Sequence, residues 1–501
     1  MDLDSLPSVR AVRQPVRSST EAAEAFDSIT YSKGGAILRM LENWIGAEAF
    51  RDAIRVYTRK FAGRSVHASD FFGVLEEQTK KPVSRVASEF VDKPGVPLLS
   101  FALACDSKGA HLNVEERTYR PKGFAAVPEA SWTIPVCVRH SNAANQECFI
   151  VDRQTRTLPL GGNTCPTWVH PNARGAGYFR FDLPETEWAH LFAHLGELDV
   201  PEKGAALASL MASVNTGKVP PTVLVELLPQ FDREMDSDLT EQIVRVLEGL
   251  SRTFVNDKNR APFRAWASAR LAPKKRTLGW GENAKGESSE AALHRRTLLY
   301  AMADIAHDPE TRKEAELIAQ RWFRDPHAIS ADTAEIALDI ASRDAKKERV
   351  DQLRAALDRA SSPAERTSLL RATTGFDDDA TLAEGLSLLL TDSVKMQDLR
   401  YTVDNSGHRL ATAEATRRWV FSHWNELTKK FVGSLGRYFV GLTKEACTEA
   451  ALTESTHFFS DRVKSIDGAE RAYKEGVDQA TMCIALRALP PLAPGDFTRR
   501  K

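Results

Sequence analysis

The stretch FDSITYSKGGAILRML, residues 26–41, leads from a polar segment into an apolar helix. Its apolar residues recur at helical spacing, which predicts an amphipathic helix from about residue 34 onward. From the residues alone, Tyr31 would pack against Phe26 at the beginning of this helix. Gly34 and Gly35 each cost a helix roughly 1 kcal/mol relative to alanine, so a demand outside local propensity must favour them. Close approach of another backbone is one such demand.

The segments on either side define the first two parts of the chain. Residues 1–19 are rich in Pro, Ser and Arg without periodicity, which predicts an extended lead-in. Residues 20–97 repeat apolar side chains at helical spacing and predict four amphipathic helices with short links. The stretch DKPGVPLLSF, residues 92–101, then ends the helical period with two prolines and a glycine.

Residues 98–198 change to an alternating pattern. In SWTIPVCVRH, residues 131–140, every second residue from Trp132 to Val138 is apolar, which is typical of one face of a strand. Further short strand-like runs are separated by Gly, Pro and Asn. Strands at this spacing predict an antiparallel β-sandwich.

Residues 199–501 contain helical stretches separated by short polar breaks, and strand patterns disappear. No sharp sequence repeat occurs. Paired amphipathic helices over this length nevertheless favour a solenoid-like stack of the HEAT or armadillo kind. The expected fold is therefore multidomain: a helical segment, a sandwich and a large all-α domain.

Composition excludes several function classes. The chain has 501 residues, with 67 Lys plus Arg against 68 Asp plus Glu, so the net charge of -1 gives no electrostatic footprint for nucleic acid. No apolar run is long enough to span a membrane, and the N-terminus has no apolar core of a signal peptide. As written, the chain is expected in the cytoplasm, but the sequence leaves open where its native N-terminus lies.

Two histidines have the spacing of metal ligands. His190 and His194 would share one face of a helix and could both reach a zinc ion. The zinc peptidase motif H-E-x-x-H requires Glu after the first His, and this chain has Leu191 there. We therefore interpret the pair as surface histidines.

The residues around Tyr31 closely resemble the stretch that follows the zinc site in the aminopeptidase N family of zinc aminopeptidases. The resemblance covers residues 20–101 and extends to CPTWVHPNARGAGYFRF, residues 165–181, and to two stretches near the C-terminus, residues 403–427 and 457–480. The family motif F-D-x-I-x-Y-x-K-G-A opens a helix that lines the active site. It implies a thermolysin-like catalytic domain, then a sandwich and a helical domain, in the order predicted above. Gly35 stands where the family usually has alanine.

By this resemblance, Tyr31 matches the family tyrosine whose hydroxyl donates a hydrogen bond to the oxyanion of the tetrahedral intermediate. Lys33 is expected to be a solvated helix residue. The family's H-E-x-x-H motif, its third zinc ligand and its G-x-M-E-N segment lie upstream of the tyrosine, and none is present here. The chain alone is therefore expected to bind no zinc and to be inactive as a metallopeptidase.

The resemblance implies that this chain is the C-terminal part of an enzyme that removes N-terminal residues from peptide substrates. Its partner would be a missing N-terminal half, either encoded upstream of Met1 or supplied as a separate chain. A noncatalytic interaction scaffold, with a helical solenoid and a sandwich, is the alternative from a different class. No membrane or nucleic-acid partner is expected.

Six cysteines are too few for a disulfide scaffold and form no C-x-x-C pair. Cys148 and Cys165 are candidates for one disulfide across the sandwich if the protein is exported. Buried free thiols are the alternative, and the sequence leaves both open.

Overall fold

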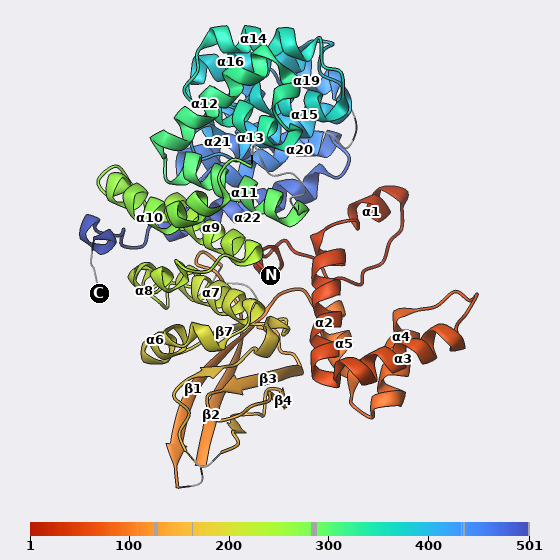
Figure 1. The fold of residues 1–501 in the computed structure, drawn as a ribbon. Coiled ribbons are helices and arrows are strands. Elements are labelled where there is room, and N and C mark those ends of the chain that lie inside the picture. Colours follow the sequence, from red (N-terminus) through yellow and green to blue (C-terminus); the bar gives the residue numbers. More distant parts are fainter. Residues whose placement is uncertain are drawn as a thin grey trace. The chain divides into compact units, whose positions relative to one another are not determined.

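A computed structural model describes residues 1–107, 109–124, 129–162, 164–281, 288–431, 433 and 436–498. The chain divides into two compact units, Met1–Gln230 and Phe231–Lys501. Both units are drawn in Figure 1. Helices predominate in the chain, and the small sheets that the structure describes lie in the first unit. Among the described helices, none combines the length and the apolar character that a membrane crossing requires.

Before its strands, the first unit contains the helices of the segment that includes Tyr31. They are α1 (Ser19–Glu24), a π-helical turn (Ile29–Lys33), α2 (Gly34–Ile45), α3 (Ala47–Lys60), α4 (Ala68–Thr79) and α5 (Val83–Asp92). The helices predicted from apolar spacing are thus confirmed. The extended lead-in is wrong at its beginning, because Leu3–Ser5 form a short 3₁₀ helix in which Asp4 is buried.

Among the described residues that follow, seven strands form two sheets. They are β1 (Pro97–Asp106), β2 (Gly109–Thr118), β3 (Ile134–His140), β4 (Glu147–Val151), β5 (Thr157–Pro159), β6 (Val169–His170) and β7 (Arg180–Asp182). One sheet has the order β5-β2-β1-β7 and the other β4-β3-β6. The purely antiparallel arrangement is wrong at one place, since β7 pairs with β1 in parallel, with Leu98 opposite Arg180. The unit continues with the α-helices α6 (Glu185–Ala193), α7 (Val200–Asn215) and α8 (Pro221–Leu227).

A buried histidine in the first unit makes its stability depend on pH. His170 is fully buried in β6; its Nδ1 accepts the Asn172 N–H at 3.2 Å, so Nε2 carries the proton and donates to the Glu202 carbonyl at 2.9 Å. Burial lowers the pKa of His170 to about 4. Protonation would place a second ring N–H against a backbone N–H.

We expect the first unit to lose stability in mild acid through His170. Neutral His170 contributes to the free energy of unfolding because its folded-state pKa lies below the ordinary value. This contribution is complete above about pH 6.5 and is lost as pH falls toward about 4, which lowers the free energy of unfolding by about 3 kcal/mol in all. Urea unfolding of His170→Gln should therefore depend less on pH between about 7 and 5 than that of the unchanged protein. His194→Gln, at the end of α6, is the matched control. An unchanged pH dependence in His170→Gln would contradict this assignment.

The second unit consists of helices among its described residues. They are α9 (Ser237–Thr253), α10 (Arg260–Leu278), α11 (Ser289–Tyr300), α12 (Pro309–Arg324), α13 (Ala331–Ser342), α14 (Lys347–Leu357), α15 (Pro363–Ala372), α16 (Asp379–Ser387), α17 (Leu399–Gly407), α18 (Ala413–Ser422), α19 (Trp424–Lys430), α20 (Gly436–Gly441), α21 (Glu449–Phe459) and α22 (Ala469–Arg487). The buried faces of α11 to α22 share one apolar core, which includes Leu338, Leu369 and Leu386.

A buried arginine links three helical segments of this unit. Arg343 follows α13, and its side chain is only 1% exposed. It binds Asp339 at 2.7 Å and Asp304 at 2.9 Å, and it donates to the carbonyl of Gly375 at 3.0 Å. Burial opposes the charged form, but the two carboxylates outweigh it and hold the pKa of Arg343 well above its usual value. One side chain thus joins the segments that follow α11, α13 and α15.

The six cysteines form three disulfides: Cys105–Cys165, Cys137–Cys148 and Cys447–Cys483. The predicted Cys148–Cys165 bond is therefore wrong, and so is the alternative of free thiols. The physical reason is strand register. Antiparallel pairing of β3 with β4 places Cys137 directly opposite Cys148, which leaves Cys165 to the cysteine near the end of β1.

Candidate functional site

Tyr31 lies on the outer side of the π-helical turn that leads into α2. Ile29 and Lys33, one turn apart, are buried beneath it, whereas Tyr31 is 62% exposed. Its ring contacts Phe26 with centroids 6.1 Å apart, which confirms the predicted contact, but Phe26 is itself 74% exposed. Within the described part of the chain, no hydrogen bond engages the Tyr31 hydroxyl. Packing against Phe26 therefore leaves the hydroxyl accessible.

A buried ion pair holds the turn from below. Lys33 Nζ lies 2.9 Å from Asp4 Oδ2, both side chains are 1% exposed, and Nζ also donates to the Lys93 carbonyl at 2.8 Å. Asp4 accepts further hydrogen bonds from the Gly95 N–H and the Tyr178 hydroxyl. Burial lowers the pKa of Lys33 and raises that of Asp4, and each charge offsets part of the other's shift. The expectation that Lys33 is solvated is wrong, because its carboxylate partner lies in the supposed lead-in.

A second ion pair holds the turn at its beginning. The carboxylate of Asp27 lies 2.7 Å from the Arg10 guanidinium and accepts the Thr30 N–H at 2.9 Å. The Asp27 carbonyl accepts the Tyr31 N–H at 3.1 Å. Arg10 also donates to the Thr30 hydroxyl at 2.6 Å. Both charged side chains of the pair are mostly buried. The backbone that carries Tyr31 is thus fixed on both sides.

The two glycines beside Tyr31 have ordinary helical conformations. A Cβ added at Gly34 or Gly35 would meet no atom within 4 Å, so the predicted close approach of another backbone is not found among the described residues. Leu38, one turn further along α2, is 39% exposed. We name the exposed surface formed by Phe26, Tyr31, Gly35 and Leu38 the Tyr31 face. It is mainly apolar around one hydroxyl.

The described residues do not provide a zinc site. No group of three or more His, Cys, Asp or Glu side chains among them could hold a metal ion. His190 is exposed on α6, and the ring of His194 interacts through Nδ1 with the carbonyl of His190 at 2.8 Å. The zinc expected for the family does not fit these residues, and we assign no metal-dependent step to them.

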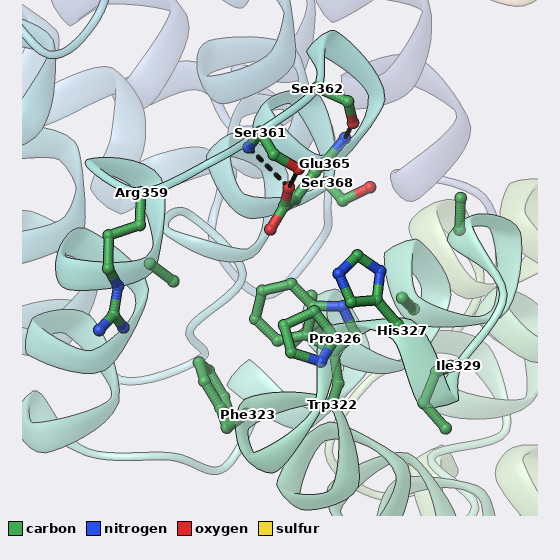
Figure 2. Close-up of a pocket in the computed structure, with 14 residues that line it drawn as sticks. Trp322, Phe323, Pro326, His327, Ile329, Arg359, Ser361, Ser362, Glu365 and Ser368 are labelled. Atoms are coloured by element: carbon green, nitrogen blue, oxygen red, sulfur yellow. Dashed lines mark hydrogen bonds between the residues drawn. The ribbon is translucent and has the colours of Figure 1, made fainter.

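The second unit contains a cavity of about 630 Å³ between α12, α13 and the α14–α15 connection. Its apolar floor includes Trp322, Ile329 and Leu338. Figure 2 shows Ser361 bound to Glu365 on the opposite side; the backbone N–H and the hydroxyl of Ser361 donate at 2.8 and 2.9 Å. This carboxylate is therefore already engaged. The cavity resembles a binding site more than a catalytic one.

Sequence reasoning missed the residues that hold Tyr31, namely Asp4, Arg10 and Lys93. They are distant from the motif in sequence and have no pattern of their own. One signal was available: Ile29 and Lys33 have i, i+4 spacing, so a buried Ile29 places Lys33 on the inner side of the same turn.

Comparisons with known proteins identify the family of this chain. Residues 168–482 match the family model described as ERAP1-like C-terminal domain, and residues 1–90 match the peptidase family M1 domain. Aminopeptidase M1-B of Oryza sativa subsp. japonica is 23% identical over 98% of this chain and 58% of its own length. Aminopeptidase 2, mitochondrial, of Saccharomyces cerevisiae is 22% identical over 96% of this chain and 50% of its own length.

The puromycin-sensitive aminopeptidase of Caenorhabditis elegans is 20% identical over 97% of this chain and 52% of its own length. The chain belongs to the aminopeptidase N family, peptidase family M1. It spans about half the length of the curated relatives that it matches.

Proposed function

We propose that this chain is the C-terminal portion of a zinc-dependent aminopeptidase that removes N-terminal residues from peptides. In the complete enzyme, Tyr31 donates a hydrogen bond to the oxyanion of the tetrahedral intermediate. The supporting observation is the contrast at the motif. The backbone turn is anchored by the Lys33–Asp4 and Arg10–Asp27 pairs, yet the hydroxyl it presents is exposed and has no hydrogen-bond partner among the described residues.

This arrangement suits transition-state stabilisation. A tyrosine hydroxyl is a neutral donor, and its hydrogen bond strengthens as negative charge develops on the substrate oxygen. A donor held in advance on a rigid turn needs little reorganisation when the charge appears. Lys33, by contrast, is a positioning residue, because its ammonium group faces Asp4 beneath the turn.

The zinc ligands and the general base of the family reaction come, in this proposal, from a second part of the enzyme that packs on the Tyr31 face. That part is encoded upstream or supplied as a separate chain. The proposed domains are residues 20–97, the helical tail of a thermolysin-like domain; 98–198, a β-sandwich formed by the two sheets; and 199–501, a HEAT-like helical domain that holds the peptide. Residues 1–19 are the lead-in, which contributes Asp4 and Arg10 to the anchoring of the Tyr31 turn. The chain alone is then inactive.

A noncatalytic interaction scaffold is the second candidate. The cavity beside Trp322 favours it, because an apolar floor with a polar rim suits binding without chemistry. In that case the Tyr31 motif would be a relic, and no added segment would restore peptidase activity.

An aminopeptidase assay separates the two candidates. The purified chain with added zinc is compared with a form extended by the coding sequence upstream of Met1, using a fluorogenic aminoacyl substrate. We expect hydrolysis by the extended form, its loss on chelation and recovery with zinc, and no hydrolysis by the chain alone. Activity of the chain alone would contradict the proposal, and a folded but inactive extended form would favour the scaffold.

A further inference from the structure

The three disulfides are formed by different parts of the fold. Cys137 and Cys148 are directly opposite each other on β3 and β4, with Cα atoms 4.0 Å apart. Cys105 and Cys165 are separated by 60 residues, and their Cα atoms lie 5.8 Å apart. Cys447 and Cys483 belong to the second unit, with Cα atoms 5.4 Å apart. Strand register, a long loop closure and helix packing thus each place two cysteines at or near bonding distance.

The surroundings of these cysteines favour the oxidised state. Cys105, Cys148 and Cys165 are exposed, where a free thiol would be open to oxidation and exchange. Cys137, Cys447 and Cys483 are buried, and each lies beside its partner. Six cysteines scattered over 501 residues would rarely fall into three bonding pairs by chance. Disulfides of this kind persist in oxidising compartments and are rare where thioredoxin and glutathione keep thiols reduced.

The Cys447–Cys483 bond reinforces other contacts of one segment. Arg487 of α22 donates to the Cys447 carbonyl at 3.1 Å. Two residues before Cys447, the mostly buried Glu445 pairs with Arg252 of α9 and with His408, whose Nδ1 lies 3.2 Å from the Glu445 carboxylate. The bond therefore fastens a segment that also joins α9 and α22, and its position fits a structural role.

We infer that this protein works in an oxidising compartment with all six cysteines paired. Each pair forms when two thiols lose two protons and two electrons to the disulfide of a dithiol–disulfide oxidoreductase, which leaves as a dithiol. This location differs from the cytoplasmic one expected from the sequence. Combined with the proposed function, on which this last clause rests, it assigns the substrates to peptides of that compartment.

Thiol counting tests the inference independently of peptidase activity. The protein is recovered from its own cells in acid, which preserves the state of its thiols. It is then denatured in the presence of a thiol-alkylating reagent, with or without prior reduction, and the labelled cysteines are mapped by mass spectrometry. We expect no alkylated cysteine before reduction, six after it, and three cross-linked peptide pairs. Free thiols in most molecules at any of the six positions would overturn the inference.

Two single substitutions test the pairing. In Cys105→Ser, produced in the same cells, Cys165 should become alkylated while Cys148 stays protected. In Cys137→Ser, Cys148 should become alkylated while Cys165 stays protected. Protection of both Cys148 and Cys165 in each variant would assign the bond to Cys148 and Cys165 and overturn the pairing. Protection of Cys447 and Cys483 in both variants shows that the second unit has kept its disulfide, so that the change in labelling is confined to the first unit.

Discussion

Replacing Arg343 with methionine is expected to lower the free energy of unfolding of the second unit by about 3–5 kcal/mol. The substitution keeps much of the side-chain volume but removes the charge. Asp339, which is fully buried, would lose its ion pair, and the Gly375 carbonyl would lose a donor. The pKa of Asp304, which the neighbouring arginines hold at about 2 against the effect of burial, would rise. The large cost comes from leaving the buried Asp339 carboxylate without its cationic partner, since only the neutral Asn405 amide still donates to it.

Arg418→Met is the matched control for this prediction. Arg418 pairs with Glu414 on the surface of α18, and both side chains are more than 60% exposed. Such pairs contribute little, so a change below about 0.5 kcal/mol is expected. Urea unfolding, with hydrogen exchange of the α13 and α15 amides as a local probe, measures both variants. Equal stabilities of the two variants would show that the Arg343 cluster does not hold these helices together.

Local patterns predicted the elements well. The apolar spacing after residue 34 gave α2, and the alternation from Trp132 to Val138 gave β3. Both signals are local, because helix and strand periodicity depend on neighbouring residues. The parallel pairing of β7 with β1 could not be read in this way, because alternation identifies a strand face but not its partner. The prediction of the disulfide failed for the same reason, since the observed pairing of Cys137 with Cys148 follows from the register of β3 and β4.

At the candidate site, the resemblance identified Tyr31, and the structure adds the residues that hold it. Lys33 was misjudged because a lysine near a helix start is usually solvated. Its burial depends on Asp4, whose position beneath the turn is a tertiary feature. The glycines are still without a local explanation, since no described atom approaches them. In the proposed enzyme, the missing part packs on this open surface.

Replacing Tyr31 with phenylalanine should remove only the hydroxyl, because the ring contact with Phe26 and the anchoring ion pairs are kept. In the complete enzyme, loss of one oxyanion donor is expected to lower kcat by about 10²- to 10³-fold. KM should change little, because the hydrogen bond strengthens mainly in the transition state. Tyr57→Phe on α3 is the matched control, since its ring packs edge-on against Phe71 and phenylalanine keeps that contact.

The most direct test of the central claim is the kcat of the zinc-loaded extended protein with Tyr31→Phe, measured beside the unchanged protein and Tyr57→Phe. We predict a fall of at least about 100-fold in Tyr31→Phe alone, with zinc content and unfolding midpoint unchanged. A kcat within about twofold of the unchanged protein would contradict the assignment of Tyr31 as the oxyanion donor.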